Sequence, residues 1–175
     1  MSETGHARVV VGVGESMSGL QALRYAVAEA RRRGSVLRAV RAWQFAVPWP
    51  GYAVDQCRDQ AGANAYETIR QSFYSAMGGL PRDLEFELIA VEGAIGPALV
   101  AQTRSDDDLL IVGAPLRRRW STSLFTVDRQ CVRLASCPVV VVPAPALARE
   151  RRAKALARAL TREAQRYVKA DGSSR

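Results

Sequence analysis

The sequence is poor in the residues that build metal centres and disulfide frameworks. It holds one histidine, His6, and three cysteines, Cys57, Cys131 and Cys137, none of them in a C-x-x-C pair. A single histidine in the N-terminal lead-in excludes a His-rich metal site and argues against a Ser-His-Asp mechanism, because candidate nucleophiles such as Ser16 have no base. Three such cysteines predict neither a zinc site nor a disulfide framework. We therefore expect no metal and no catalytic residue.

Long apolar runs are also missing. None approaches the roughly 20 residues that a membrane-spanning helix needs. The N-terminus lacks the charged-then-apolar order of a secretion signal. Hydrophobic residues still make up 48% of the 175 residues, which suffices for one ordinary domain with a core. These features predict a soluble cytoplasmic protein without a membrane span.

Acidic residues are scarce in the last part of the chain. Residues 149–175 hold nine Lys or Arg against three Asp or Glu, so this segment carries most of the net charge of +8. Residues 146–169 contain no Gly or Pro, which favours a helix. This basic tail has three open interpretations: packing on its own domain or on a partner, binding a protein, nucleic acid or anionic membrane surface, or remaining solvated and unfolded.

Strands and helices are expected to alternate along the rest of the chain. Continuous β-branched runs such as 8–13 predict strands covered on both faces, as in a parallel sheet. The five expected strands are 8–13, 35–43, 84–91, 109–112 and 138–142. The expected helices run from Ser16 or Ser18 to Gly34, and over 54–77, 98–103 and 123–135. This order predicts an α/β fold, a five-stranded parallel Rossmann-like sheet with helices on both faces, plus a basic C-terminal helix.

The expected organisation is a flexible N-terminus over residues 1–7, a domain over 8–145 and the basic tail over 146–175. The strand 84–91 alternates between apolar and polar residues, which predicts that one of its faces is open to water. Pro97 suits the first turn of its helix.

The loop 113-GAPLRRRWSTSLFT-126 follows a predicted buried strand. Ligands of parallel sheets lie at the carboxyl ends of strands, where the strand order reverses. Phosphate-binding loops there are usually glycine-rich, because the backbone must come close to the phosphate. This loop has one glycine, with Arg117, Arg118 and Arg119. It is therefore a phosphate site built on arginines, the remnant of one, or an exposed basic loop.

Five segments in order resemble a universal stress protein domain of the actinobacterial kind. They are RVVVGV, ALRYAVAEARRRGSVLRAVRAW, VEGAIGPALV, DDDLLIVGA and ASCPVVVVP. The resemblance runs over residues 8–143. It implies a five-stranded Rossmann-like domain, and a homodimer that often forms through the last strand, here Val139–Val142.

Many members of that family bind ATP, and this chain departs from their motifs. In the pattern G-x-x-G followed by G-S or G-T, Gly113 keeps the first position but Leu116 replaces the second glycine, and Phe125 precedes Thr126. In the pattern V-D-x-S, Gly14 replaces the aspartate. A Cβ costs roughly 1 kcal/mol where the left-handed conformation is needed, and the lost aspartate removes about 1–3 kcal/mol.

We therefore predict a non-catalytic, regulatory homodimer with a degraded nucleotide site, no expected cofactor, and weak or absent ATP binding. One alternative is a nucleotide switch with weak ATPase activity, in which the three arginines and Ser121, Thr122 and Ser123 replace the glycines. Another is a nucleic-acid-associated protein that acts through the tail. The candidate nucleotide contacts are Gly12, Gly14, Ser16, Ala42, Gly113, Arg117, Arg118, Ser123 and Thr126.

Overall fold

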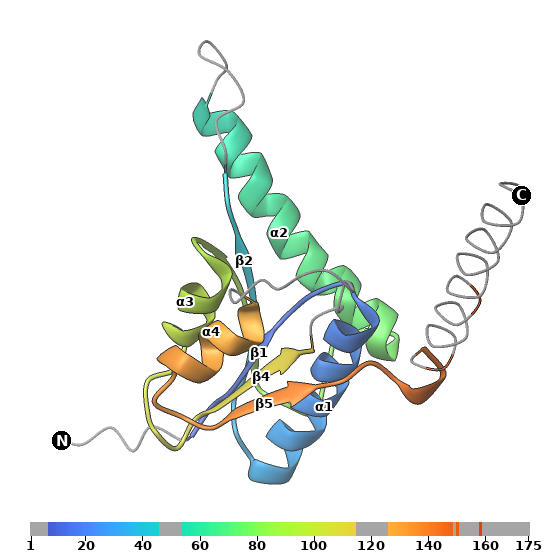
Figure 1. The fold of residues 1–175 in the computed structure, drawn as a ribbon. Coiled ribbons are helices and arrows are strands. Elements are labelled where there is room, and N and C mark those ends of the chain that lie inside the picture. The colour runs from blue at the N-terminus through green and yellow to red at the C-terminus, as the bar shows by residue number, and fades with distance from the viewer. Residues whose placement is uncertain (1–6, 46–53, 115–125, 149, 151–157, 159–175) are drawn as a thin grey trace, which may run out of the picture. The chain divides into compact units, whose positions relative to one another are not determined.

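The structure, a computed structural model, describes residues 7–45, 54–114, 126–148, 150 and 158 (Figure 1). The chain divides into two units, Met1–Pro143 and Ala144–Arg175. Strands and helices alternate through the first unit. They are β1 (Val9–Gly12), α1 (Met17–Arg33), β2 (Leu37–Trp43), α2 (Val54–Met77), β3 (Phe86–Glu92), α3 (Ile95–Val100), β4 (Leu109–Gly113), α4 (Val127–Leu134) and β5 (Val139–Val142).

The five strands form one parallel sheet in the order β3-β2-β1-β4-β5. Val9 of β1 pairs with both Leu37 of β2 and Leu109 of β4, so β1 is the central strand. α1 and α2 pack on one face of the sheet, and α3 and α4 on the other (Figure 1). The α/β fold predicted from the sequence is confirmed.

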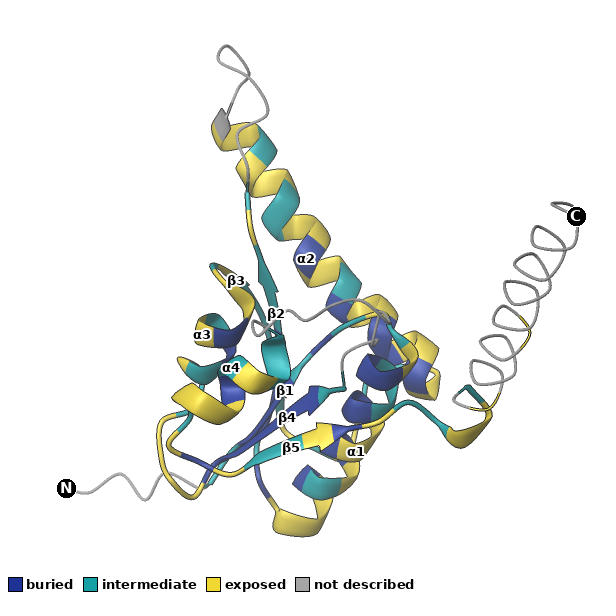
Figure 2. Ribbon diagram, viewed as in Figure 1, coloured by how far each residue is buried: buried dark blue, intermediate teal, exposed yellow. Residues whose placement is uncertain are grey.

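Each face of the sheet has its own apolar core. Val9 and Val11 of β1 point into the cluster under α1 and α2, whereas Val10 points into the cluster under α3 and α4. All three valines are fully buried, as the continuous β-branched run predicts. In Figure 2 the inner strands are dark blue, the colour of buried residues, and the outer sides of the helices are yellow, the colour of exposed residues.

The prediction that one face of the third strand is open to water is wrong. Phe86 and Leu88 pack on the α1/α2 cluster, while Ile89 and Val91 pack on the α3/α4 cluster. Both faces of this edge strand therefore contact a core, and the exposed residues are at Glu87 and the end of the strand. The apparent alternation is misleading because two neighbouring apolar residues serve opposite faces.

The ends of α1 are set by its capping residues. The Ser16 side chain accepts a hydrogen bond from the Gly19 N–H, and Gly34 ends the helix in the left-handed conformation at φ 62°. The helix expected over 98–103 begins earlier, at Ile95, with Pro97 in its first turn as predicted. Its N-cap, Ala94, makes no side-chain hydrogen bond, so the sequence carries no capping signal there.

The basic C-terminal tail is described at only a few positions. Residues 146–148, Glu150 and Arg158 are helical. The rest of the predicted helix lies outside the described residues, so the basic C-terminal helix stays a prediction.

A buried carboxylate joins β1 to β4 at the amino end of the sheet. Asp108 is almost completely buried. Its Oδ1 accepts from the Arg8 N–H at 2.7 Å, and its Oδ2 accepts from the N–H groups of Arg104 and Ser105 at 2.7 and 3.3 Å. Three backbone donors thus stabilise one buried charge.

Replacing this carboxylate should destabilise the fold. We expect Asp108→Asn to lower the free energy of unfolding by about 2 kcal/mol, because an amide has one acceptor oxygen for three donors. Urea unfolding followed by circular dichroism measures the loss. Asp107→Asn is the matched control, since Asp107 is exposed and should change stability by less than about 0.5 kcal/mol. Equal effects of both variants would contradict this role for Asp108.

A second carboxylate is held by two arginines near the end of α1. Glu29 accepts from the Arg32 side chain at 2.6 and 2.9 Å and from Arg33 Nε at 2.6 Å. These hydrogen bonds, that of Arg32 first, lower the pKa of Glu29 from 4.5 to about 2. A lowered carboxyl pKa contributes stability above the unfolded value, and this contribution is lost as the pH falls through the folded value.

Glu29→Gln should therefore lower the urea midpoint at neutral pH, and its difference from the wild type should shrink as the pH falls from 4.5 towards 2. The measurement is a series of urea unfolding curves at stepped pH. Glu67→Gln is the control, because Glu67 is 3.6 Å from Arg70 and both are exposed. A difference for Glu29→Gln that stays constant with pH would refute the explanation.

Candidate functional site

The strand order reverses between β1 and β4, so a ligand is expected at the carboxyl ends of these two strands. β1 leads into α1 on one face of the sheet, and the chain after β4 leads towards α4 on the other face. The described part of this edge consists of residues 12–18, 113–114 and 126, with the end of β2 beside it. Of the candidate contacts, Arg117, Arg118 and Ser123 lie outside the described residues, as do Arg119, Ser121 and Thr122.

The two serine side chains at the start of α1 bond within the chain. Ser16 Oγ accepts from the Gly19 N–H at 3.0 Å and lies 3.1 Å from Ser18 Oγ. Ser18 is buried, and its Oγ donates to the carbonyl oxygen of Ala114 at 2.7 Å. Of the two helix caps that the sequence allows, Ser16 is therefore the cap, and Ser18 ties α1 to the end of β4.

Gly113 allows a close approach between β4 and α1. A Cβ at this position would lie 2.8 Å from the Gly19 nitrogen and 2.8 Å from the Ser18 carbonyl carbon. Real Cβ atoms do not tolerate that distance to a backbone, so any larger residue would push the strand and helix apart. Within the described residues, the observed reason for glycine at 113 is this contact with α1.

Two other predicted site residues face the α3/α4 side of the sheet. A Cβ at Gly12 would lie 2.8 Å from the Leu99 side chain, so this glycine makes room for α3. Ala42 pairs with Val91 of β3 and is half-buried. The structure therefore brings Gly12, Gly14, Ser16 and Gly113 to one edge, with Ala42 further along it.

Thr126 is the N-cap of α4, but its side chain makes no capping hydrogen bond. The hydroxyl stands at the start of the helix that follows the arginine-rich loop. A helix N-terminus carries a partial positive charge. Thr126 is thus the described residue of this loop most suited to meet an anion.

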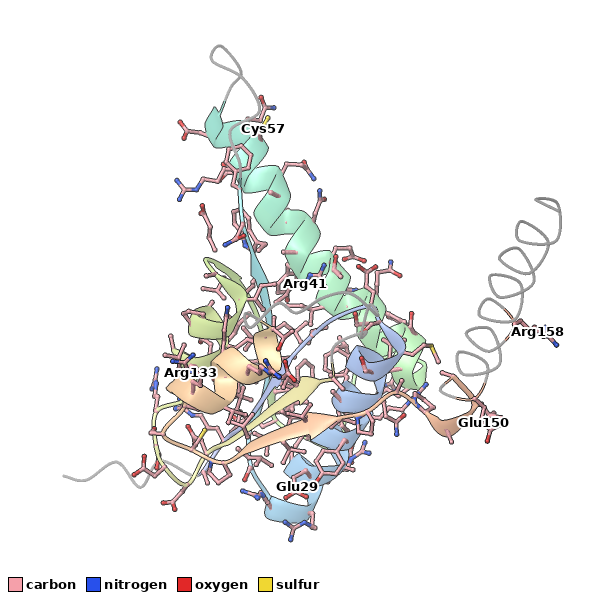
Figure 3. The ribbon with its side chains drawn as sticks, in the orientation of Figure 1. Glu29, Arg41, Cys57, Arg133, Glu150 and Arg158 are labelled. Carbon is pink, nitrogen blue, oxygen red and sulfur yellow. The ribbon has the colours of Figure 1, made fainter. Side chains whose placement is uncertain are left out.

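Gly14 leaves open space at the corner between β1 and β2. A Cβ built there would have no neighbouring heavy atom within 4 Å. The side chain of Arg41, from the end of β2, reaches this corner: its Nη1 donates to the Val13 carbonyl oxygen at 3.4 Å, and its Nη2 lies 3.6 Å from Glu15 Oε2. Figure 3 labels Arg41 on β2. Sequence reasoning missed this residue, although an arginine among the apolar residues of a predicted strand was a usable signal.

The two buried cysteines offer no reactive thiolate. Cys131 and Cys137 are buried. Burial, followed by the nearby charge of Asp128, raises the pKa of Cys131 to about 11, and burial also raises the pKa of Cys137. Both thiols are therefore protonated at neutral pH and act as small apolar groups.

Among the described residues, no group of three or more His, Cys, Asp or Glu side chains is placed to hold a metal ion. In the same part of the chain, none of the helices combines the length and apolarity that crossing a membrane requires.

Solved universal stress proteins share the fold described above. One, in complex with cAMP, is 23% identical and aligns over 81% of this chain and 100% of its own, with a TM-score of 0.51. Universal stress protein UspA from Lactobacillus plantarum is 18% identical over 80% of this chain and 99% of its own, with a TM-score of 0.58. A family protein from Arabidopsis thaliana with AMP bound is 18% identical over 80% and 93%, with a TM-score of 0.50. No curated protein matches this chain.

Residues 6–143 match the Universal stress protein family, and this segment includes every strand of the sheet and the edge at which Gly14 and Gly113 lie. The chain therefore belongs to the universal stress protein family.

Proposed function

We propose that this protein is a non-catalytic, homodimeric regulator whose nucleotide site is degraded relative to that of ATP-binding members of its family. The proposal rests on how the polar groups are bonded at the edge of the sheet where the carboxyl ends of β1 and β4 lie. Its described hydroxyl groups at Ser16 and Ser18 bond within the chain, and Gly14 has no side chain.

The described residues do not fit ATP well. The aspartate that ATP-binding relatives carry after the first strand is replaced by Gly14, so a hydrogen-bonding carboxylate is missing from this corner. Gly113 is in contact with Ser18 and Gly19, which leaves its backbone less room beside a phosphate. In the sequence, the larger residues Leu116 and Phe125 stand at positions where the ATP-binding motif has glycine. The remaining polar group of the motif is the Thr126 hydroxyl.

The hydrogen bonds of the two described serines at this edge support a non-catalytic role. Ser18 Oγ donates to a backbone carbonyl, and Ser16 Oγ accepts from a backbone N–H. Neither hydroxyl is hydrogen-bonded to a carboxylate or histidine among the described residues. Nucleophilic catalysis by serine needs such a base, so binding is the activity that this edge supports.

The rival proposal is a nucleotide switch. Structures of similar fold hold cAMP in one case and AMP in another, which keeps this proposal open. In this chain the phosphate contacts would come from Thr126 and from the arginines of the loop before it. The two proposals differ by orders of magnitude in the expected affinity for ATP.

A melting experiment separates the two. With a degraded site of Kd ~1 mM, ATP and magnesium at about 1 mM should stabilise the protein by ~0.4 kcal/mol, which raises Tm by about 1 °C. A micromolar site would give ~4 kcal/mol and a rise of about 10 °C. Freshly purified protein should also release no stoichiometric nucleotide on denaturation. A large rise in Tm, or a stoichiometric release of AMP or ATP, would contradict the degraded site.

The proposed dimer uses the free edge of β5. Among the described residues β5 pairs with β4 alone, so its outer edge has unpaired backbone groups. Val141 of β5 is 38% exposed, and Val132 of the adjacent α4 is 59% exposed. These valines line a shallow groove of about 360 Å³ together with Asp128, Arg129 and Arg133. A second copy would cover both the edge and the apolar side chains.

A charge on this edge should separate the subunits. We expect the wild type to sediment at twice the chain mass and Val141→Asp to sediment as a monomer, because a carboxylate would be desolvated in the interface. The side chain is exposed, so the fold should survive, as circular dichroism can verify. Tyr74→Asp on exposed α2 is the control and should remain dimeric. A Val141→Asp variant that keeps the wild-type mass would rule out the β5 interface.

A further inference from the structure

Arg41 is an arginine whose partners are distant. Its guanidinium has two neighbours among the described residues, the Val13 carbonyl at 3.4 Å and the Glu15 carboxylate at 3.6 Å. Ordinary N–H···O hydrogen bonds span 2.7–3.2 Å, so neither contact is a strong one. Five other ion pairs of the described residues are at 2.6–2.7 Å: Arg31–Asp83, Arg32–Glu29, Arg33–Glu29, Arg38–Glu87 and Arg58–Glu92. The remaining pair, Arg70–Glu67, is also at 3.6 Å, but its arginine is more exposed than Arg41.

The Arg41 side chain is also partly withdrawn from water. It is 29% exposed, whereas its neighbour Glu15 is 72% exposed. A guanidinium carries five N–H donors and is always charged. No Arg41 nitrogen is among the buried, unpartnered side-chain atoms of the described residues, so its remaining N–H donors face solvent, from which an anion can approach. The guanidinium is thus ready to accept an anion.

There is room for an anion beside Arg41. Gly14 adjoins Val13, which the guanidinium contacts, and the space where a Gly14 side chain would stand is empty to 4 Å. In ATP-binding relatives an aspartate occupies the matching position, where it adds negative charge. In this chain Gly14 has no side chain, and the Arg41 guanidinium of β2 contacts the carbonyl oxygen of the preceding residue, Val13. An anion in this open space would lie next to the guanidinium that contacts Val13.

Glu15 does not block the corner. An exposed ion pair at 3.6 Å contributes between zero and about 1 kcal/mol. A bidentate phosphate contact to arginine is stronger, since both groups are charged and their geometries match. A phosphate can therefore displace Glu15, which swings into solvent.

We propose that Arg41 binds the phosphate group of a small ligand in the corner between the carboxyl ends of β1 and β2. This inference rests on the proposed function, because it names the ligand class of the same degraded site. It places the phosphate beside Gly14 on β1, away from the Gly113 motif on β4. The source of the group is either free phosphate or the phosphate of a mononucleotide, and the two are distinguished below.

The test is a titration with inorganic phosphate followed by the amide NMR signals of Gly14 and Glu15, with chloride keeping the ionic strength constant. We expect saturating shifts with a Kd in the millimolar range. Arg41→Gln should weaken binding at least about tenfold. Arg41→Lys should weaken it less, because lysine keeps the positive charge but lacks the paired N–H donors that bind two phosphate oxygens at once. Glu15→Gln should tighten binding about two- to threefold, because it removes the competing carboxylate.

Arg58→Gln is the matched control. Arg58 of α2 has a close partner, Glu92 at the end of β3, at 2.7 Å, so its removal should leave phosphate binding unchanged. If Arg41 only stabilised the loop through Glu15, Glu15→Gln would weaken binding rather than tighten it. That result, unsaturated shifts in the wild type, or equal binding by Arg41→Gln would each overturn the proposal.

A parallel titration with AMP and adenosine identifies the source of the phosphate. Equal Kd values for AMP and phosphate, with no adenosine binding, indicate free phosphate. AMP binding at least about tenfold tighter than phosphate, and sensitive to Arg41→Gln, indicates a mononucleotide. Tight ATP binding that ignores Arg41→Gln would refute both the degraded site and this inference, whereas weak ATP binding without phosphate binding would refute the inference alone.

Discussion

The contact between the end of β4 and the first turn of α1 determines the shape of the carboxyl edge. Gly113 brings the strand against Ser18 and Gly19, and the Ser18 hydroxyl bonds to the Ala114 carbonyl across that contact. This hydrogen bond holds the start of α1 against the end of β4. The Ser18 hydroxyl is therefore already engaged and does not face a ligand as a free donor. Open space remains at Gly14, where a Cβ would have no neighbouring heavy atom within 4 Å.

Two arginines of β2 show how the same residue type acquires different roles. Arg38 and Arg41 are three positions apart, so on a strand they point to opposite faces. Arg38 pairs with Glu87 of the neighbouring strand at 2.6 Å, on the α3 side. Arg41 has no residue of opposite charge across from it, since Ala90 stands there, and it turns to the loop after β1.

Sequence patterns predicted the elements more reliably than the polar contacts. The valine run of β1, the Ser16 cap and Gly34 each carry a local signal, and the structure confirms all three. The two-sided burial of β3 carried no such signal, because it depends on the helices before and after β3 folding back over opposite faces of the sheet. The same holds for Asp108: three aspartates follow one another, and only the fold decides which one meets the Arg8 N–H. The positions of Gly12, Gly14, Ser16 and Gly113 at one edge followed from the strand order, whereas the reach of Arg41 did not.

The alternation of the β1 valines has a consequence for cooperativity. Val9 and Val11 belong to one apolar cluster and Val10 to the other, so a single short strand is shared by two cores. If β1 left the sheet, apolar residues of both cores would become exposed to water. The free energies of the two layers are therefore coupled through β1, since loss of this strand would destabilise both cores at once.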